Sequence, residues 1–443
     1  MTISIVGAGP TGLYLGIALA RHGHRVRLIE RDAGPSPDGT WARRGVMQFH
    51  HAHGFRPQVT DALRAEMPEV YDRWLDLGAE PVDLPGPTGT IRMGTRSRRM
   101  LFEQALREIA AAQPGLELII GHVDSVLVGQ DRAAGLVVDG TPVPSDVVID
   151  ASGRSGRVTR SLGARKAIGG SCGIAYVDRM YQLHDPADAG PLTNPLAWQA
   201  DFDGYQVLVF LHELGIFSAV IIRPSVDREL QQLRDDAAFD AACRAIPGLS
   251  HWTDPSRSRP VTPVLPGANL LNHYQAQTTG DGRLVLPGLY FVGDAVCTTT
   301  PTFGRGMATS LLQARELLRL IDTDSDPTSI GHDFDAWCER ELRPWVEDHM
   351  RIDDAQRRRW LGADIDLTAK LPSDLIMKAA QVDPTIQPAA WDYLAMTDGA
   401  LVLDPFEERA RAVYRTGWRP PWSDGPSRDE LVAIISADQT LAA

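Results

Sequence analysis

The stretch TISIVGAGPTGLYLGIALARHGHRVRLIE, residues 2–30, decides the fold. Its glycines Gly7, Gly9 and Gly12 follow the order G-x-G-x-x-G, which serves a tight turn, the close approach of a pyrophosphate and the packing of helix on strand. The start of the helix offers unpaired N–H groups to phosphates. Glu30 ends the second strand, where a carboxylate can accept hydrogen bonds from a ribose. The stretch therefore predicts a dinucleotide-binding βαβ unit, without distinguishing NAD from FAD.

Two later segments favour a flavin. One apolar run ends on Asp150 and enters a turn of small residues, while residues 288–321 contain a strand that ends at Asp294, a loop with proline and glycine, and a helix. A carboxylate just past a strand end can bind a ribityl hydroxyl, although either aspartate could also only cap a turn. Glycine in the loop allows backbone to lie against a flat ring. A helix that starts at Gly306 and Met307 would point its positive end at this ring and stabilise its anionic reduced form.

Together these motifs resemble the FAD-dependent monooxygenases of the p-hydroxybenzoate hydroxylase fold, and among them most closely the branch with alkene epoxidases of polyether pathways. The resemblance covers roughly residues 1–325, and several motifs in the same order are more specific than any one of them. The motifs are the glycine turn with Glu30, Arg43-x-Gly45-Val46-x-Gln48 with His51-x-His53, Arg99-x-x-x-Glu103, Asp150-Ala151-Ser152-Gly153-Arg154, Gly293-Asp294-Ala295-Val296-Cys297, and Pro301-x-x-Gly304-x-Gly306-Met307.

The resemblance implies a role for each motif in binding FAD. The glycine turn and Glu30 would hold the adenosine half and the diphosphate, and Val123 would contact adenine through its backbone. Arg99 would lie near the diphosphate or the ribityl chain, and Asp294 in the ribityl-diphosphate region. The flavin ring would be bordered by Arg43, Gln48, Pro301, Gly304, Gly306 and Met307. No side chain is assigned as catalytic, because the flavin carries the chemistry; the ring-side candidates are Arg43, Gln48, Pro301 and Gly306.

Three positions depart from the pattern of this branch. Thr300-Pro301 stands in place of Asn-Pro, and Val46-Met47-Gln48 in place of Val-Pro-Gln. Arg305 stands where the branch has glutamine, so we expect an additional positive charge beside the flavin edge.

The stretch GVMQFHHAHGF, residues 45–55, could hold a metal or border the cofactor. His51 and His53 alternate as on a strand and would then share one side. A third ligand is missing from the pattern, since no H-E-x-x-H, cysteine pair or acidic calcium loop accompanies them. We therefore predict no metal, and leave open whether His50, His51 and His53 pack in the interior or line a cavity.

The fold class predicted from these segments is α/β, with a Rossmann-like FAD-binding domain, an inserted antiparallel β-sheet substrate domain and a C-terminal helical region. Strand-like runs between the flavin motifs form the insert; in YQVLVFLHEL both faces are apolar, so one would pack on helices and the other would line a pocket or pack as well. The helical tail would cap the flavin domain. The predicted ranges are 1–78, 99–168 and 284–325 for the FAD-binding domain, 79–98 and 169–283 for the substrate domain, and 326–443 for the C-terminal region.

The composition is that of a soluble globular protein in more than one packed unit. The chain has 443 residues and a net charge of −13, which argues against a nucleic-acid partner. Its 4 cysteines are widely spaced, which favours reduced thiols over disulfides or a thiolate zinc site. With no leader-like start and no apolar run long enough for a membrane span, we expect a cytoplasmic protein.

These features predict an FAD-dependent monooxygenase. It would insert one oxygen atom from O₂, via a flavin C4a-hydroperoxide, into an apolar alkene or aromatic substrate resembling a natural product. A phenol would need a base and an alkene would not; no base stands out, which favours epoxidation over hydroxylation. No second G-x-G-x-x-G is present, so either NAD(P)H binds transiently or a separate flavin reductase supplies reduced flavin. The alternatives are an FAD-dependent alkene reductase (saturase) of the geranylgeranyl reductase type, and an NAD-dependent dehydrogenase or binding protein.

Overall fold

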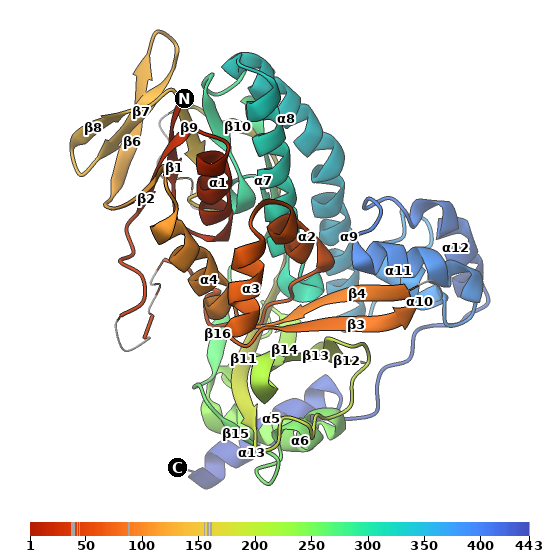
Figure 1. Cartoon of the computed structure of the whole chain (residues 1–443). Coiled ribbons are helices and arrows are strands. Elements are labelled where there is room, and N and C mark those ends of the chain that lie inside the picture. The colour runs from red at the N-terminus through yellow and green to blue at the C-terminus, as the bar shows by residue number, and fades with distance from the viewer. Residues whose placement is uncertain are drawn as a thin grey trace.

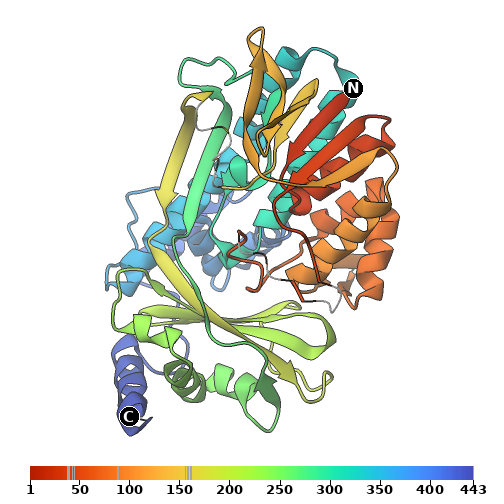
Figure 2. The same cartoon turned by 90° about the vertical axis from the view of Figure 1, so that its left-hand side faces the viewer.

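The computed structural model describes residues 1–36, 40–41, 43, 45–86, 89–154, 156, 159 and 162–442. The predicted fold class is confirmed: a Rossmann-like domain, antiparallel sheets and C-terminal helices make up the chain (Figure 1). In the view of Figure 2 the antiparallel sheet lies below the N-terminal parallel sheet. Helices within these ranges are too short or too polar to cross a bilayer.

The N-terminal domain is built on a parallel sheet with the strand order β18-β9-β1-β2-β5. Buried parallel strands are apolar along their whole length, which is the pattern of the first strand of the chain. The sheet strands are β1 (Thr2–Val6), β2 (Arg25–Glu30), β5 (Leu116–Ile120), β9 (Val147–Asp150) and β18 (Leu289–Phe291).

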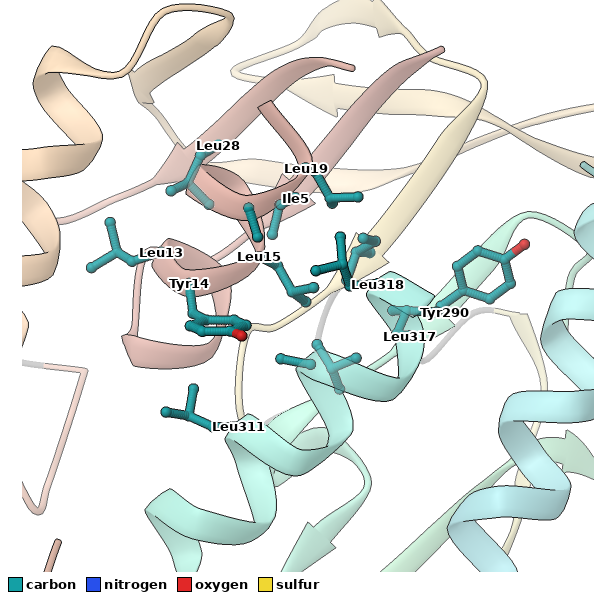
Figure 3. Packing of buried hydrophobic residues seen from close by; sticks show 14 of the residues in the cluster. Ile5, Leu13, Tyr14, Leu15, Leu19, Leu28, Tyr290, Leu311, Leu317 and Leu318 are labelled. Carbon is teal, nitrogen blue, oxygen red and sulfur yellow. The ribbon is translucent and has the colours of Figure 1, made fainter. Parts of the chain in front are cut away.

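Helices cover this sheet and bury its core. Figure 3 shows Leu15 and Leu19 of the first helix packed towards Leu317 and Leu318 of a helix almost 300 residues later, with Ile5 from β1 beside them. Helices α1 (Pro10–Arg21) and α4 (Arg99–Ala112) contact the sheet strands, and α7 (Gly306–Thr323) packs on α1. Helices α2 (Pro57–Glu66) and α3 (Pro68–Asp76) pack on α7 and α4. The starts of α4 and α7 agree with the sequence-based predictions. A three-stranded antiparallel sheet branches off before β9, formed by β6 (Val123–Gly129), β7 (Arg132–Val138) and β8 (Thr141–Pro144).

The predicted antiparallel insert is present as a sheet of order β12-β13-β14-β11-β15, with β16 also paired to β11. Its strands are β11 (Ile174–Leu183), β12 (Ala197–Phe202), β13 (Tyr205–Leu211), β14 (Ile216–Pro224), β15 (Ser258–Pro260) and β16 (Leu265–Gly267). One face packs on α5 (Asp236–Ala245), α6 (Pro247–Thr253) and the last helix of the chain.

Two smaller sheets join the halves of the molecule. The strands β10 (Arg165–Ser171), β17 (Leu271–Thr279) and β19 (Cys297–Thr298) pair antiparallel, so β10 runs across the predicted boundary at residue 168. The hairpin of β3 (Glu80–Gly86) and β4 (Gly89–Arg96) leads from α3 to α4.

The C-terminal region does not act as one cap, which corrects the prediction for the tail. Helices α8 (Pro327–Glu341) and α9 (Arg343–Trp360) pack on β17 and the FAD-binding domain. A separate apolar cluster joins α10 (Ser373–Ala379), α11 (Gln387–Ala395) and α12 (Glu407–Arg415) to the start of α7. Helix α13 (Arg428–Ala442) instead packs against α5 on the antiparallel sheet, because Leu431 and Ile435 complete the apolar core there.

Candidate cofactor and substrate site

One large cavity lies between the parallel and the antiparallel sheets. Its volume is about 1720 Å³, well above the range of roughly 300–1000 Å³ that is usual for a drug-sized ligand. The walls come from the glycine turn, the segment before Phe55, the starts of α4 and β6, the turn after β9, the antiparallel sheet and the loop before α7. A dinucleotide and a second molecule can therefore share it.

The glycine turn has the geometry that a bound diphosphate requires. Gly7 has a φ of +97°, and a Cβ there would lie 2.8 Å from the carbonyl oxygen of Ala151. A Cβ at Gly12 would lie 2.0 Å from the carbonyl oxygen of Gly7, so only glycine lets the helix start so close to the strand. At Gly9 a Cβ would meet no described atom within 4 Å, and the residue lines the cavity. The side of Gly9 that the sequence assigns to a diphosphate is therefore open to the cavity.

Glu30 and Arg43 form a buried ionic cluster beside this turn. The Glu30 carboxylate accepts hydrogen bonds from the Ala8 N–H at 2.8 Å and from Arg43 Nη2 at 2.7 Å. Arg43 also pairs with Asp32 at 3.2 Å and with Glu103. Burial alone would lower the Arg43 pKa, but Glu103 and Glu30 outweigh it and raise the pKa. The contacts of Arg43 thus lie at the glycine-turn end of the cavity, whereas the resemblance placed it near the ring.

Arg99 and Asp294 both line the cavity, Arg99 from the start of α4 and Asp294 from the turn after β18. Arg99 starts α4, donates from Nε to Glu103 at 2.5 Å and lies with Nη1 3.5 Å from His53 Nε2. Asp294 lies on a short turn after β18 and is exposed to the cavity, and no described side chain donates a hydrogen bond to its carboxylate. Desolvation raises its pKa, opposed by Arg99 and Arg154. A carboxylate held in this way can accept hydrogen bonds from ligand hydroxyls.

The loop before α7 lies against the histidine-rich stretch. Gly304 has a φ of +60°, and a Cβ there would approach the Cα of Gly54 to 3.4 Å. The backbones of two segments far apart in sequence thus meet at this wall of the cavity. The predicted ring-side residues that line the cavity are Arg43, Gln48, Pro301, Gly304, Gly306 and Met307, and Val123 lines it as well. Their contacts with FAD stay predictions.

The expected positive charge of Arg305 at the flavin edge is wrong. This side chain is fully buried and turns away from the cavity into the C-terminal region. Its guanidinium carbon lies 4.5 Å from the ring centroid of Phe303, and 4.3 Å from the centroids of Trp345 and of Tyr393. The aromatic rings of α9 and α11 attract a cation from the loop, and this preference was not visible in the local sequence.

The stretch from residue 45 to 54 forms turns rather than a strand, so the prediction that His51 and His53 share one side is wrong. His51 turns to the antiparallel sheet, where Nδ1 lies 2.5 Å from a carboxylate oxygen of Asp178. His53 Nδ1 lies 2.9 Å from the carbonyl oxygen of His51, so this nitrogen donates, and burial with Arg99 nearby lowers the His53 pKa to about 3. His50 and His53 line the cavity. Among the described residues, no three metal-ligating side chains come together.

One face of the antiparallel sheet packs on helices, and the other face borders the cavity. Val207 and Val209 belong to the core shared with α5 and α6, while Leu208 belongs to a second cluster on the opposite face. Tyr176 and Phe210 on that face line the cavity. The alternative of two packed faces without a pocket is therefore wrong, and the sheet provides an aromatic wall.

Sequence reasoning missed Asp178 and Tyr176. Asp178 interrupts the apolar strand IAYVDRMYQL and is fully buried, so a charged residue inside a strand was the available signal. Its other oxygen accepts from the Ala52 N–H at 3.1 Å, which joins the antiparallel sheet to the histidine-rich stretch. Asp150 instead accepts from the Ser152 N–H at 2.9 Å, as a turn cap does. Residues 155, 157, 158, 160 and 161 of the segment after it lie outside the described part of the chain.

Comparisons with known proteins agree with this geometry. Residues 5–65 match the family described as an NAD(P)-binding Rossmann-like domain. The chain is 26% identical over 350 residues to the 3-demethoxyubiquinol 3-hydroxylase of Escherichia coli (strain K12). This alignment covers 76% of this chain and 82% of that protein.

Two solved structures with the same fold are flavin-dependent enzymes. The flavin-dependent brominase Bmp2 superposes with a TM-score of 0.61 at 16% identity, over 94% of this chain and 98% of the brominase. PqsL of Pseudomonas aeruginosa, a probable FAD-dependent monooxygenase, superposes with a TM-score of 0.57 at 15% identity, over 82% of this chain and 98% of PqsL. At these identities the likeness shows the fold alone. The predictions of a flavin-dependent enzyme and of FAD as its cofactor are confirmed.

Proposed function

We propose that the protein is an FAD-dependent monooxygenase that inserts one oxygen atom from O₂ into an apolar alkene or aromatic substrate. The observation that carries the proposal is the single cavity that runs from the glycine turn to the aromatic face of the antiparallel sheet. A nucleotide site that opens directly onto an apolar wall suits a cofactor and a substrate that must meet.

The residues on the nucleotide side have the chemistry to bind FAD. The first N–H groups of α1 and the open side of Gly9 would bind the diphosphate, and Glu30 would accept from the adenosine ribose. Asp294 would accept from ribityl hydroxyls, and the start of α7 would place its positive end beside the ring. When bound, FAD supplies the electrons and the oxygen chemistry, while the protein orients the reactants and excludes water.

The substrate side favours an apolar molecule that needs no deprotonation. Tyr176 and Phe210 offer aromatic rings, and Ala52 extends this wall. His53 is the histidine closest to Arg99, and with its pKa near 3 it is neutral and a weak base at neutral pH. This supports epoxidation of an alkene, which needs no base. The name of the Escherichia coli relative points to hydroxylation of an apolar quinol, whereas the polyether resemblance points to an alkene.

The reductant is part of the proposal. NAD(P)H would bind transiently over the flavin, or a separate flavin reductase would supply the electrons. Stopped-flow mixing of the FAD-loaded protein with NADPH or NADH distinguishes these routes, because only the first bleaches the flavin without a partner.

The experiment for the reaction separates the monooxygenase from the alternative saturase. The FAD-loaded protein is reduced and mixed with apolar alkenes and aromatic compounds, once under ¹⁸O₂ and once without oxygen. We expect products that carry one ¹⁸O atom and form only with oxygen. Products that gain two hydrogens without oxygen would instead identify an alkene reductase, and a protein that gains no flavin spectrum with FAD would contradict both.

A further inference from the structure

The loop before α7 is tied to the C-terminal helices by a buried polar network. Arg305 is the residue that precedes α7, and its side chain reaches His349 of α9, with 2.8 Å between Nη1 and Nε2. Both side chains are fully buried. The aromatic rings of Phe303, Trp345 and Tyr393 surround the same guanidinium.

The direction of the hydrogen bonds follows from the chemistry of arginine. Arginine can only donate, so His349 Nε2 accepts and its proton lies on Nδ1. His349 Nδ1 then donates to Thr300 Oγ at 2.9 Å. Burial, with Arg305 and Arg56 nearby, lowers the His349 pKa well below its usual value, which agrees with a neutral ring.

The hydrogen-bond network also connects the loop to Asp353 of α9 and Asn272 of β17. Thr300 Oγ lies 3.4 Å from a carboxylate oxygen of Asp353, and the other oxygen accepts from Asn272 Nδ2 at 2.6 Å. The Thr300 N–H donates to Asn272 Oδ1 at 2.8 Å, which closes a ring of contacts between α9, β17 and the loop. From the opposite side, Arg56 donates from Nε to the Phe303 carbonyl oxygen at 3.1 Å. The loop is thus fixed at both ends by residues outside it.

Two guanidinium nitrogens of Arg305, Nε and Nη2, have no hydrogen-bond acceptor in the described part of the chain. An unpaired buried donor is unfavourable, so a packing role alone would be served better by an apolar side chain. The rings compensate for part of this cost through attraction to the cation. The hydrogen bond to His349 and the three surrounding rings fix the guanidinium in one position, and an apolar side chain at residue 305 would lack both contacts with the C-terminal helices.

We propose that Arg305 is a positioning residue through which α9 and α11 hold the cavity-lining loop and the first turn of α7 against bound FAD. This inference rests on the proposed function. Since Pro301, Gly304 and Gly306 line the cavity on the other side of the same short loop, a shift of Arg305 moves the wall that borders the cofactor. FAD affinity and the surroundings of its ring therefore depend on helices that do not line the cavity.

The test compares variants that separate hydrogen bonding from general stability. Arg305→Gln removes the cation, His349→Leu removes the relay to Thr300, and His349→Gln keeps one acceptor and one donor. Arg411→Gln is the matched control, because Arg411 is also a buried arginine of the C-terminal region but donates to the carbonyl oxygens of Leu367 and Ala369. The readouts are the FAD Kd from fluorescence titration, the visible circular dichroism of bound flavin, and the Tm.

For Arg305→Gln and His349→Leu we expect a Kd raised about tenfold, which corresponds to about 1.4 kcal/mol, with a changed dichroism spectrum. His349→Gln should stay close to wild type, and Arg411→Gln should lower the Tm but keep the Kd. Equal Kd values for wild type and Arg305→Gln would overturn this inference but leave the proposed function intact. Equal changes of the FAD Kd in the two His349 variants would have the same consequence. If Arg305→Gln does not fold, the His349 pair decides. A wild-type chain without FAD binding would overturn the proposed function and this inference with it.

Discussion

Two helices begin at the same cavity, and they are held there in different ways. The entry to α1 depends on close backbone contacts within one short turn, where Gly12 lies against Gly7. The entry to α7 depends on Gly54, Arg56 and His349, which lie far away in the sequence. The first helix end is therefore encoded mainly by local contacts, with Ala151 also lying against Gly7, and the second by tertiary contacts. Substitutions should affect the two ends differently.

The largest effect is expected for Gly12→Val at the local end. Its Cβ would lie 2.0 Å from the Gly7 carbonyl oxygen, so backbone must move. We expect a loss of about 3 kcal/mol or more in the free energy of unfolding together with loss of FAD binding. Denaturant unfolding and FAD titration measure both. A stable variant that binds FAD normally would show that α1 is not held by this contact.

Gly9→Val sharpens the comparison because it changes the same turn without a clash inside the protein. A Cβ there meets no described atom within 4 Å, yet it projects into the space assigned to the diphosphate. We expect FAD affinity to fall about 100-fold, or by about 2.7 kcal/mol, while the Tm stays near wild type. If the variant loses stability but keeps its FAD affinity, the diphosphate lies elsewhere.

Asp294→Ala tests the turn that faces α7. The carboxylate is exposed to the cavity and receives no hydrogen bond from a described side chain, so its removal takes away an acceptor for the ligand. We expect FAD to bind about tenfold more weakly. Asp281→Ala is the control, since that carboxylate is exposed near Arg283, away from the cavity. Unchanged FAD affinity in Asp294→Ala would contradict the placement of Asp294.

The smallest effect concerns pH at the entry to α7. Burial lowers the His349 pKa, so the unfolded chain binds a proton below about pH 6.5 that the folded chain does not, and stability is lost as the pH falls. Burial raises the Asp353 pKa to about 7, so between about pH 7 and 4 the folded chain holds a proton that the unfolded chain releases. This second titration stabilises the fold as the pH falls.

The two variants should therefore change the pH dependence in opposite directions. Between pH 7 and pH 5, His349→Gln should lose less stability than wild type and Asp353→Asn should lose more. Denaturant unfolding at the two pH values measures this difference. A change of the same sign in both variants would contradict these assignments, while a Gly9→Val protein should show the wild-type dependence.

The same contrast explains how much the sequence could predict. Glycine spacing and apolar periodicity are local signals, so they correctly predicted the βαβ unit, the start of α7 and three strands of the antiparallel insert, β11, β13 and β14. The alternation of residues in YQVLVFLHEL also predicted which side chains of β13 share a face. These features depend on backbone geometry and burial within a few residues.

Side-chain directions were beyond the reach of local patterns. The aromatic rings that attract Arg305 lie in helices of the C-terminal region, and the partner of His51 lies on β11. Nothing in the sequence near residue 305 or residue 51 specifies these partners. In the same way, α13 packs on α5 because Leu431 and Ile435 are buried against apolar residues that lie far away in the sequence. Such contacts form only when the domains assemble.

The most direct test of the account is an equilibrium titration of the apo chain with FAD, followed by flavin fluorescence and visible absorbance, and a parallel titration with NAD. Both helix ends face one cavity, so we predict one FAD per chain, a resolved spectrum of bound flavin and much weaker binding of NAD. Tight binding of NAD with no change in the flavin signals would contradict the account.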